Sequence, residues 1–190
     1  NSTFAEKFLA WLPTESLNSI QELYIRSFDV QAITTLDIGY VLFGDDYKRG
    51  ELLSHLNREH VANGVDCRGE LADNLPNVLR LLARLKNEEL IEELVQDLLV
   101  PAVSSMIGEF SSDRIKAKYA SYEKHYKTLL VTPGDRIEQQ TLYVETLKAL
   151  DSALRADFAI PEWVAQMRAS DFLASIQTEN RIESEDGTPD

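Results

Sequence analysis

Three side chains in the segment 46–63 have the type and the spacing to bind a metal ion. Glu51, His55 and Glu59 follow one another at intervals of four residues, so a helix would place all three on one face. Metal centres in helical bundles, however, use a Glu-x-x-His pair from each of two helices and further glutamates, and the sequence contains no such pair. We therefore interpret the three residues as a solvated ladder of charges and predict no metal site.

Catalytic motifs are absent from the sequence. It contains no His-Glu-x-x-His, no phosphate-binding glycine loop, no nucleophile elbow and no dinucleotide-binding glycine pattern. Cys67 is the single cysteine, and the adjacent Arg68 would be expected to lower the pKa of its thiol, but no histidine base stands nearby. The sequence thus favours a binding protein without catalytic residues or cofactors. An enzyme that uses Cys67 is kept as a further hypothesis.

The stretch 68–76 places two carboxylates where an apolar helix begins. Asp73 and Asn74 are both suitable N-caps, and Pro76 fits the first helical turn because its missing N–H group needs no partner there. Glu70 and Asp73 have two interpretations at this stage. They either cap the helix and compensate its dipole, or form an acidic lip on a groove that binds a basic peptide.

The acidic character of the chain restricts its partners. Its 190 residues carry a formal net charge of −13, which repels nucleic acid and anionic lipid and attracts basic partners. No apolar run reaches the roughly 18–20 residues that span a bilayer, and no signal-peptide pattern opens the chain. A single cysteine is typical of a reducing compartment. We expect a cytoplasmic protein that neither binds nucleic acid nor inserts into a membrane.

Helical periodicity dominates the chain, and we expect an all-α fold with a single globular helical bundle over residues 1–177. The segment 36–43 fits a short strand or a buried helix, and its helical neighbours favour a helix. Residues 178–190 are acidic, lack core residues and are expected to be a disordered tail. The predicted helices span 2–12, 14–29, 36–43, 46–63, 75–85, 87–110 with a kink at Pro101, 112–129, 137–158 and 161–177.

Three ordered blocks resemble one protein family. Residues 24–29, Tyr-Ile-Arg-Ser-Phe-Asp, are similar to its signature Tyr-x-x-x-Phe-Asp. Residues 36–50 resemble its apolar segment that leads to Gly-Asp and then Arg-Gly, and residues 70–76 resemble its Glu-Leu-Pro-Asp-His/Tyr-Leu-Pro block. The family is that of the respiratory nitrate reductase delta subunit, within the redox-enzyme maturation chaperones that include those of trimethylamine N-oxide and dimethyl sulfoxide reductases. The sequence departs from it at Ala72, where the family has proline, and at Asn74.

The resemblance implies an all-helical cytoplasmic chaperone of molybdoenzyme assembly. Such a chaperone binds the apo catalytic subunit of a molybdenum-cofactor oxidoreductase, often through its basic N-terminal peptide of twin-arginine type. It holds the subunit for cofactor insertion before assembly or export. A different class of function is left open, in which the chain is a constitutive helical adaptor or subunit that remains in a final redox complex.

A peptide-binding groove is predicted between the end of the helix 14–29, the corner at 43–46 and the helix that starts at 75. Aromatic and aliphatic side chains would supply apolar contacts, while carboxylates would meet an arginine of the peptide. Phe28 and Leu75 fit a plain core position equally well. The predicted peptide-binding residues are Tyr24, Phe28, Asp29, Leu42, Phe43, Asp45, Asp46, Glu70, Asp73, Asn74 and Leu75.

Overall fold

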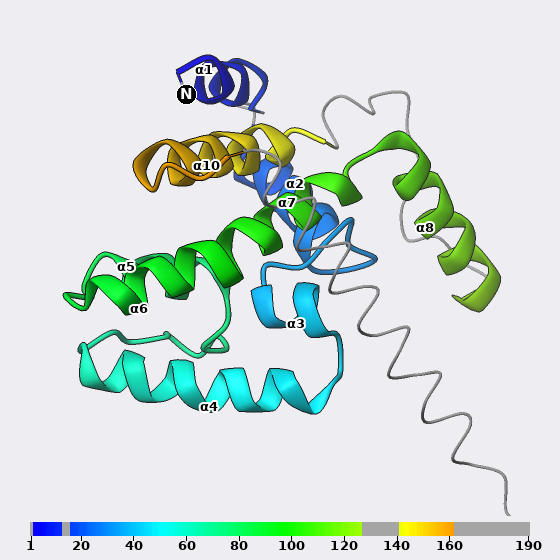
Figure 1. The fold of residues 1–190 in the computed structure, drawn as a ribbon. Coiled ribbons are helices and arrows are strands. Elements are labelled where there is room, and N and C mark those ends of the chain that lie inside the picture. Colours follow the sequence, from blue (N-terminus) through cyan, green and yellow to red (C-terminus); the bar gives the residue numbers. More distant parts are fainter. Residues whose placement is uncertain (1, 13–15, 127–140, 162–190) are drawn as a thin grey trace, which may run out of the picture.

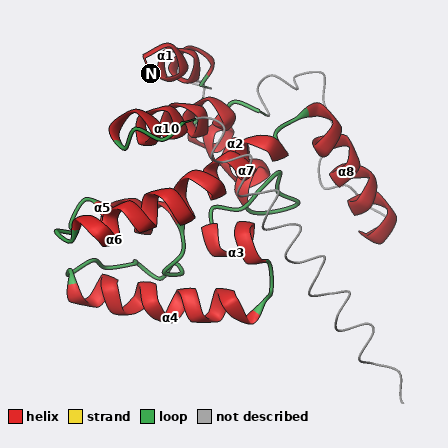
Figure 2. Ribbon diagram, viewed as in Figure 1, coloured by secondary structure: helices red, strands yellow, loops and turns green. Residues whose placement is uncertain are grey.

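Helices make up the regular structure of the chain in the computed structural model, which describes residues 2–12, 16–126 and 141–161 (Figures 1 and 2). No strand occurs in these ranges, where a single isolated antiparallel bridge joins Asp37 to Asn74. The all-α prediction is confirmed for this part of the chain. The predicted tail 178–190 lies outside the described residues, and so does all of the predicted helix 161–177 except its first residue. The predicted boundary between domain and tail at residue 177 therefore stays a prediction. Each helix in the described ranges is too short or too polar to cross a bilayer.

The first half of the chain folds into five helices, and local signals mark both ends of the longest of them, α4 (Tyr47–Ala62). Asp46 precedes α4 and accepts a hydrogen bond from the Lys48 backbone N–H at 2.8 Å. Gly64 follows the same helix with φ of 65°, which a residue without Cβ adopts readily. The ambiguous segment 36–43 is helical from Ile38 onward, as predicted. The five helices are α1 (Ser2–Trp11), α2 (Leu17–Phe28), α3 (Ile38–Phe43), α4 (Tyr47–Ala62) and α5 (Leu75–Leu82).

A long rod follows, built from α6 (Glu88–Glu93), the π-helical segment η1 (Leu94–Leu99) and α7 (Val100–Glu109) (Figure 1). Asn87 caps its start by accepting from the backbone N–H groups of Glu89 and Leu90 at 3.1 and 3.3 Å. Pro101 has no N–H group, and its ring would crowd the carbonyl four residues earlier in an α-helix. Just before the proline the backbone adopts π-type bonds, with the Val100 N–H on the Val95 carbonyl. The interruption predicted at Pro101 is thus a π-helical segment.

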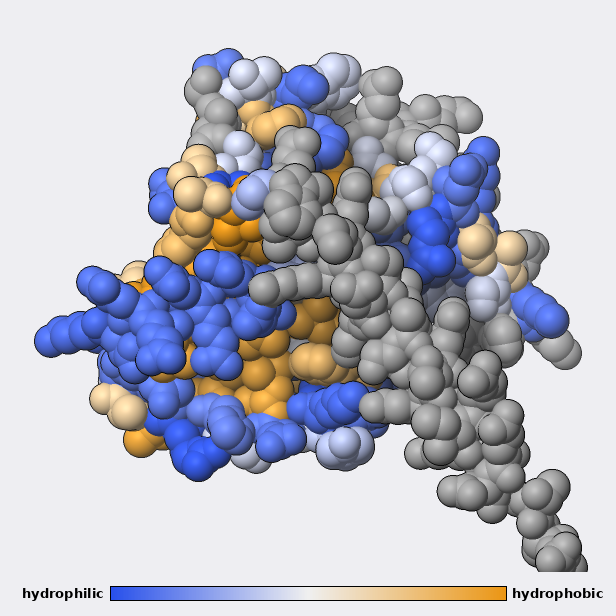
Figure 3. Space-filling view, viewed as in Figure 1, coloured by the Kyte–Doolittle hydropathy of each residue, from blue (hydrophilic) through white to orange (hydrophobic). Residues whose placement is uncertain are grey.

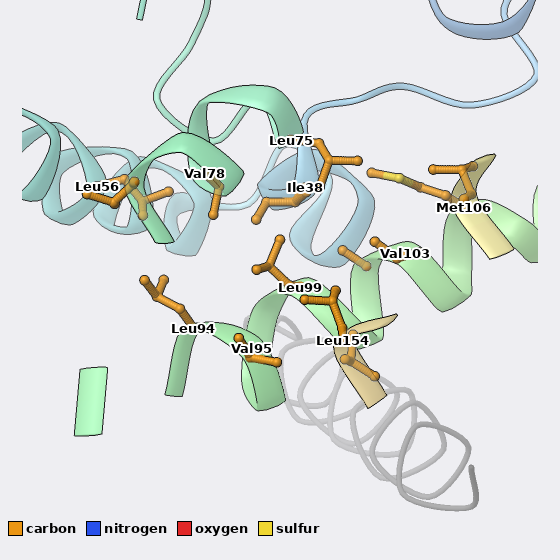
Figure 4. Close-up of a cluster of buried hydrophobic side chains, with 14 of the residues drawn as sticks. Ile38, Leu56, Leu75, Val78, Leu94, Val95, Leu99, Val103, Met106 and Leu154 are labelled. Atoms are coloured by element: carbon orange, nitrogen blue, oxygen red, sulfur yellow. The ribbon is translucent and has the colours of Figure 1, made fainter. Parts of the chain in front are cut away.

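Two further helices complete the described fold, α8 (Ser112–Tyr126) and α10 (Tyr143–Asp157). The rod η1–α7 lies at the centre, with α10 and α3 packed against α7, and α1 covers α10 (Figure 1). Figure 4 shows the resulting core, to which α3, α4, α5, η1, α7 and α10 all contribute. Its labelled members include Ile38, Leu56, Val78, Leu99, Val103, Met106 and Leu154, all buried.

Candidate functional site

A groove of about 770 Å³ lies where α2 ends, α3 begins and the loop before α5 passes. We call it the α2–α5 groove. Five of the predicted peptide-binding residues line it, although they come from segments far apart in the chain. These five are Tyr24, Phe28, Asp29, Glu70 and Asn74.

Aromatic rings form one side of the α2–α5 groove. The ring of Phe28 lies 5.1 Å from that of Tyr143 and 6.4 Å from that of Phe110, so it is held within an aromatic cluster. Tyr24 packs on Phe28 at 5.4 Å but keeps 44% of its surface exposed. Of these two rings, Tyr24 is therefore the one that a ligand can contact; Tyr40, which also lines the groove, is equally exposed.

Carboxylates surround the Tyr24 ring. Asp29 and Glu70 are exposed, and neither forms an ion pair among the described residues. Burial raises the pKa of Tyr24, and the negative charges of Glu70, Asp29 and Asp37 raise it further. Burial alone would give the same direction, so it is the three nearby carboxylates that make this end of the groove negative.

The loop that carries Glu70 is held in place by side chains of the neighbouring helices. His60, which is buried in α4, donates from Nε2 to the Ala72 carbonyl at 2.9 Å. Asn77 of α5 donates from Nδ2 to the Leu71 carbonyl at 2.8 Å. Because side chains of both helices bind carbonyl groups of the loop, the backbone that carries Glu70 has a defined place beside the groove.

Asp73 does not belong to the lip predicted for it. Its side chain is fully buried, and its Oδ2 accepts a hydrogen bond from Arg49 Nε at 3.0 Å. The N-cap position of α5 is Asn74, which makes no side-chain cap bond and instead donates to Asp37 Oδ1 at 3.2 Å. The predictions of an exposed carboxylate and of a capping role for Asp73 are both wrong, because a cation of the same chain pairs with it inside the protein.

Arg49 joins the starts of α3 and α5 to α4. Besides Asp73 it contacts Asp37, with Nη2 and Oδ2 3.2 Å apart, and its guanidinium lies 5.2 Å from the ring centroid of Tyr40. Burial alone would lower the pKa of Arg49, but the hydrogen bond and charge of Asp73, followed by the charge of Asp37, outweigh it and raise that pKa. Gly39 leaves the space for this network, since a Cβ there would stand 2.6 Å from Asp73 Oδ2.

The remaining predicted residues also lie away from the α2–α5 groove. Leu75 is a core residue with 4% of its surface exposed, and Leu42 packs against the core. The corner at 43–46 stands at the opposite end of α3, where Asp46 caps α4, Asp45 faces solvent and Phe43 lines a second groove. The prediction that this corner forms one wall of the groove is wrong.

The opposite wall of the α2–α5 groove comes from α7 and α8, which the sequence did not indicate. Glu109 accepts from Arg114 Nε at 3.1 Å and pairs with Lys118 Nζ at 3.3 Å, so the two cations share one carboxylate and this wall keeps one net positive charge. Lys118 also donates to the Ile33 carbonyl. Arg114, Lys118 and Tyr122 follow one another at intervals of four residues, so they share one face of α8. This regular spacing is the feature of the sequence that could have indicated the wall.

Metal and thiol chemistry find little support in the described residues. Within them, no group of three or more histidine, cysteine or acidic side chains is arranged to hold a metal ion. Burial raises the pKa of the Cys67 thiol; the charge of Arg80 lowers it and that of Asp66 raises it, and the net shift is upward. The expectation of a lowered pKa at Cys67 is therefore wrong, and a thiol with a raised pKa is a poorer nucleophile at neutral pH.

Comparison of the chain with protein-family models, with curated proteins and with solved structures finds no match. The resemblance of the blocks 24–29, 36–50 and 70–76 to the maturation chaperones accordingly enters below as a hypothesis about function.

Proposed function

We propose that the protein is a cytoplasmic assembly chaperone that binds the apo catalytic subunit of a molybdenum-cofactor oxidoreductase. In this proposal the α2–α5 groove takes the basic N-terminal peptide of that subunit. The chaperone holds the subunit until its cofactor is inserted and then leaves. The resemblance of the three sequence blocks to redox-enzyme maturation chaperones supports this assignment.

One observation carries the proposal: residues of all three blocks line a single groove. The blocks are separated in the chain by six and nineteen residues, yet α2, the start of α3 and the loop before α5 converge at this groove. The first block supplies Tyr24, Phe28 and Asp29, the second supplies Asp37 and Tyr40, and the third supplies Glu70 and Asn74.

The chemistry of this groove suits an arginine side chain. Guanidinium groups form charge-assisted hydrogen bonds with carboxylates and also stack on aromatic faces. Asp29 and Glu70 offer the carboxylates, and the exposed ring of Tyr24 lies among them. A lysine would reproduce the charge but neither the planar fork nor the stacking, so the groove should prefer arginine over lysine.

Binding of a synthetic peptide tests the groove. The probe is a peptide with an Arg-Arg pair ahead of a short apolar stretch, and its Lys-Lys counterpart is the comparison. We expect Glu70→Gln and Asp29→Asn each to weaken binding of the arginine peptide roughly three- to tenfold, because exposed charges contribute modestly and are screened by salt. Asp45→Asn removes an exposed carboxylate outside the groove and should change binding less than about twofold.

Equal affinities for wild type, Glu70→Gln and Asp29→Asn at low ionic strength would exclude the α2–α5 groove as the peptide site. Co-purification then separates a chaperone from a permanent subunit. The proposal requires recovery with the apo catalytic subunit and loss of that complex once molybdenum cofactor is inserted. Recovery with the active, loaded enzyme would instead assign the chain to its final complex.

A further inference from the structure

A second groove of about 710 Å³ runs between α4 and the α6–η1 part of the rod. We call it the α4–η1 groove. In Figure 3 a band of hydrophobic surface lies between hydrophilic surfaces in the region of α4 and the rod. The apolar side chains that line the groove are Phe43, Leu52, Leu56, Leu90, Leu94 and Leu98.

The two helical walls present matching apolar side chains, of which Leu56 and Leu94 are buried while the other leucines of the groove are partly exposed. Leucines recur every four residues on each wall, from Leu52 to Leu56 on α4 and from Leu90 through Leu94 to Leu98 on the rod. The principal packing partners of α4 are α3 and α5, and outside the rod η1 packs mainly on α3. Partly exposed leucines on two helical walls, above a buried apolar floor, form the kind of surface that accepts the apolar face of a third helix.

The charges at the rim differ between the walls. The segment 88–99 on the rod contains no lysine or arginine. It contains five acidic side chains, which are Glu88, Glu89, Glu92, Glu93 and Asp97. Glu93 stands at the groove edge, is exposed and forms no ion pair among the described residues. The α4 wall is mixed, because Glu51 and Arg58 both line it. An occupant of this groove would therefore gain most from positive charge on the side facing the rod.

We propose that the α4–η1 groove binds an amphipathic α-helix of a partner protein, with its apolar face on the leucines and a basic edge along α6–η1. Charge complementarity selects this occupant. Residues 162–190 of the chain itself hold more acidic than basic side chains, and a second copy brings a net charge of −13. Neither of these matches an acidic rim as a basic helix does. The proposal stands apart from the peptide site of the α2–α5 groove and does not depend on it.

A designed peptide tests this proposal with the full chain. The probe is a synthetic helical peptide of about 18 residues, roughly 27 Å long, with leucines on one stripe, lysines along one edge and alanine or glutamine elsewhere. Its counterpart carries glutamate in place of lysine. We expect Glu93→Lys to weaken binding of the lysine peptide at least about tenfold, which corresponds to ~1.4 kcal/mol. Glu92→Lys makes the same charge change at the neighbouring exposed position, which does not line the groove, and should stay within about twofold of wild type.

Equal affinities for the Glu92→Lys and Glu93→Lys proteins would overturn the proposal, because attraction would then depend on total charge alone. So would equal binding of the lysine and glutamate peptides by the wild-type chain. A photo-cross-linking benzophenone amino acid at position 55, in place of the exposed His55, identifies whatever else occupies the α4–η1 groove. Without peptide, cross-linking to residues 162–190 or to a second copy would mean that the groove is already filled by the chain, which also overturns the proposal.

Discussion

Replacing Asp73 by asparagine tests whether the Arg49 network belongs to the fold and not to a binding site. Asp73 is fully buried, and Arg49 keeps only 16% of its side chain exposed. Removing one member of a buried ion pair costs about 3–5 kcal/mol when the other charge loses its only partner. Arg49 retains Asp37 at 3.2 Å, so we expect the free energy of unfolding to fall by the smaller amount of about 2–3 kcal/mol.

Urea unfolding followed by far-ultraviolet circular dichroism measures this loss. With an m-value of about 2 kcal/mol per molar urea, the midpoint of Asp73→Asn should fall by about 1–1.5 M. Asp45→Asn is the matched control, because it removes the charge of an exposed aspartate without an ion pair among the described residues. Its free energy of unfolding should agree with wild type within the roughly 0.5 kcal/mol typical of surface substitutions, which is a midpoint shift of at most about 0.25 M.

The reasoning fails if Asp73→Asn unfolds at the wild-type midpoint but binds the arginine peptide more weakly. That combination would return Asp73 to the acidic lip suggested by the sequence. A double-mutant cycle with Arg49→Gln gives a second check, because residues in direct contact show coupling energies of about 0.5–3 kcal/mol. A coupling near zero would mean that the two side chains do not interact in solution.

Two further predictions concern stability. Gly39→Ala should lower the free energy of unfolding by about 1–3 kcal/mol, since the new Cβ would stand 2.6 Å from the buried Asp73 carboxylate. Gly50→Ala, at an open position of α4, should raise it by about 0.5–1 kcal/mol. The urea midpoint should therefore fall below wild type for the first variant and rise above it for the second. The raised pKa of Tyr24, caused first by burial, predicts full stability below about pH 10 and a loss as the pH rises further, because the unfolded chain releases the phenolic proton first. Urea midpoints between about pH 8 and 11 measure it, and a midpoint that increased over this range would contradict the assigned sign.

Local signals in the sequence were sufficient for the helices. The cap at Asp46, the glycine at the end of α4 and the cap at Asn87 are each decided within a few residues, and they place these helix ends close to the predicted bounds. An apolar residue at helical spacing is expected to face inward, as Leu56 does, but Val61 is 83% exposed. It directly follows the buried His60, and a step of one residue turns a side chain by about 100° around the helix, here from the interior to solvent.

The candidate site could be predicted only in part, because half of it depends on contacts between distant segments. Tyr24 and Glu70 were recognised as charged or aromatic side chains near helix ends, and the fold brings them together. Asp73 looked the same in the sequence, but its partner Arg49 stands 24 positions earlier, and no local pattern links the two. The wall from α7 and α8 depends equally on long-range packing, which a single sequence does not specify.

The π-helical segment η1 has a consequence for how the rod divides its surface. A π-type turn holds roughly one residue more than an α-type turn, so the angular phase of the side chains shifts across η1. Leu90, Leu94 and Leu98 can then face the α4–η1 groove while α7 directs Val103 and Met106 into the core, although the backbone stays continuous. Deleting one residue within η1 would let this turn return to α-type bonds, since the extra residue is what the π-type turn accommodates. The ring of Pro101 would then crowd the carbonyl four residues earlier, a contact that the π-type bonds avoid.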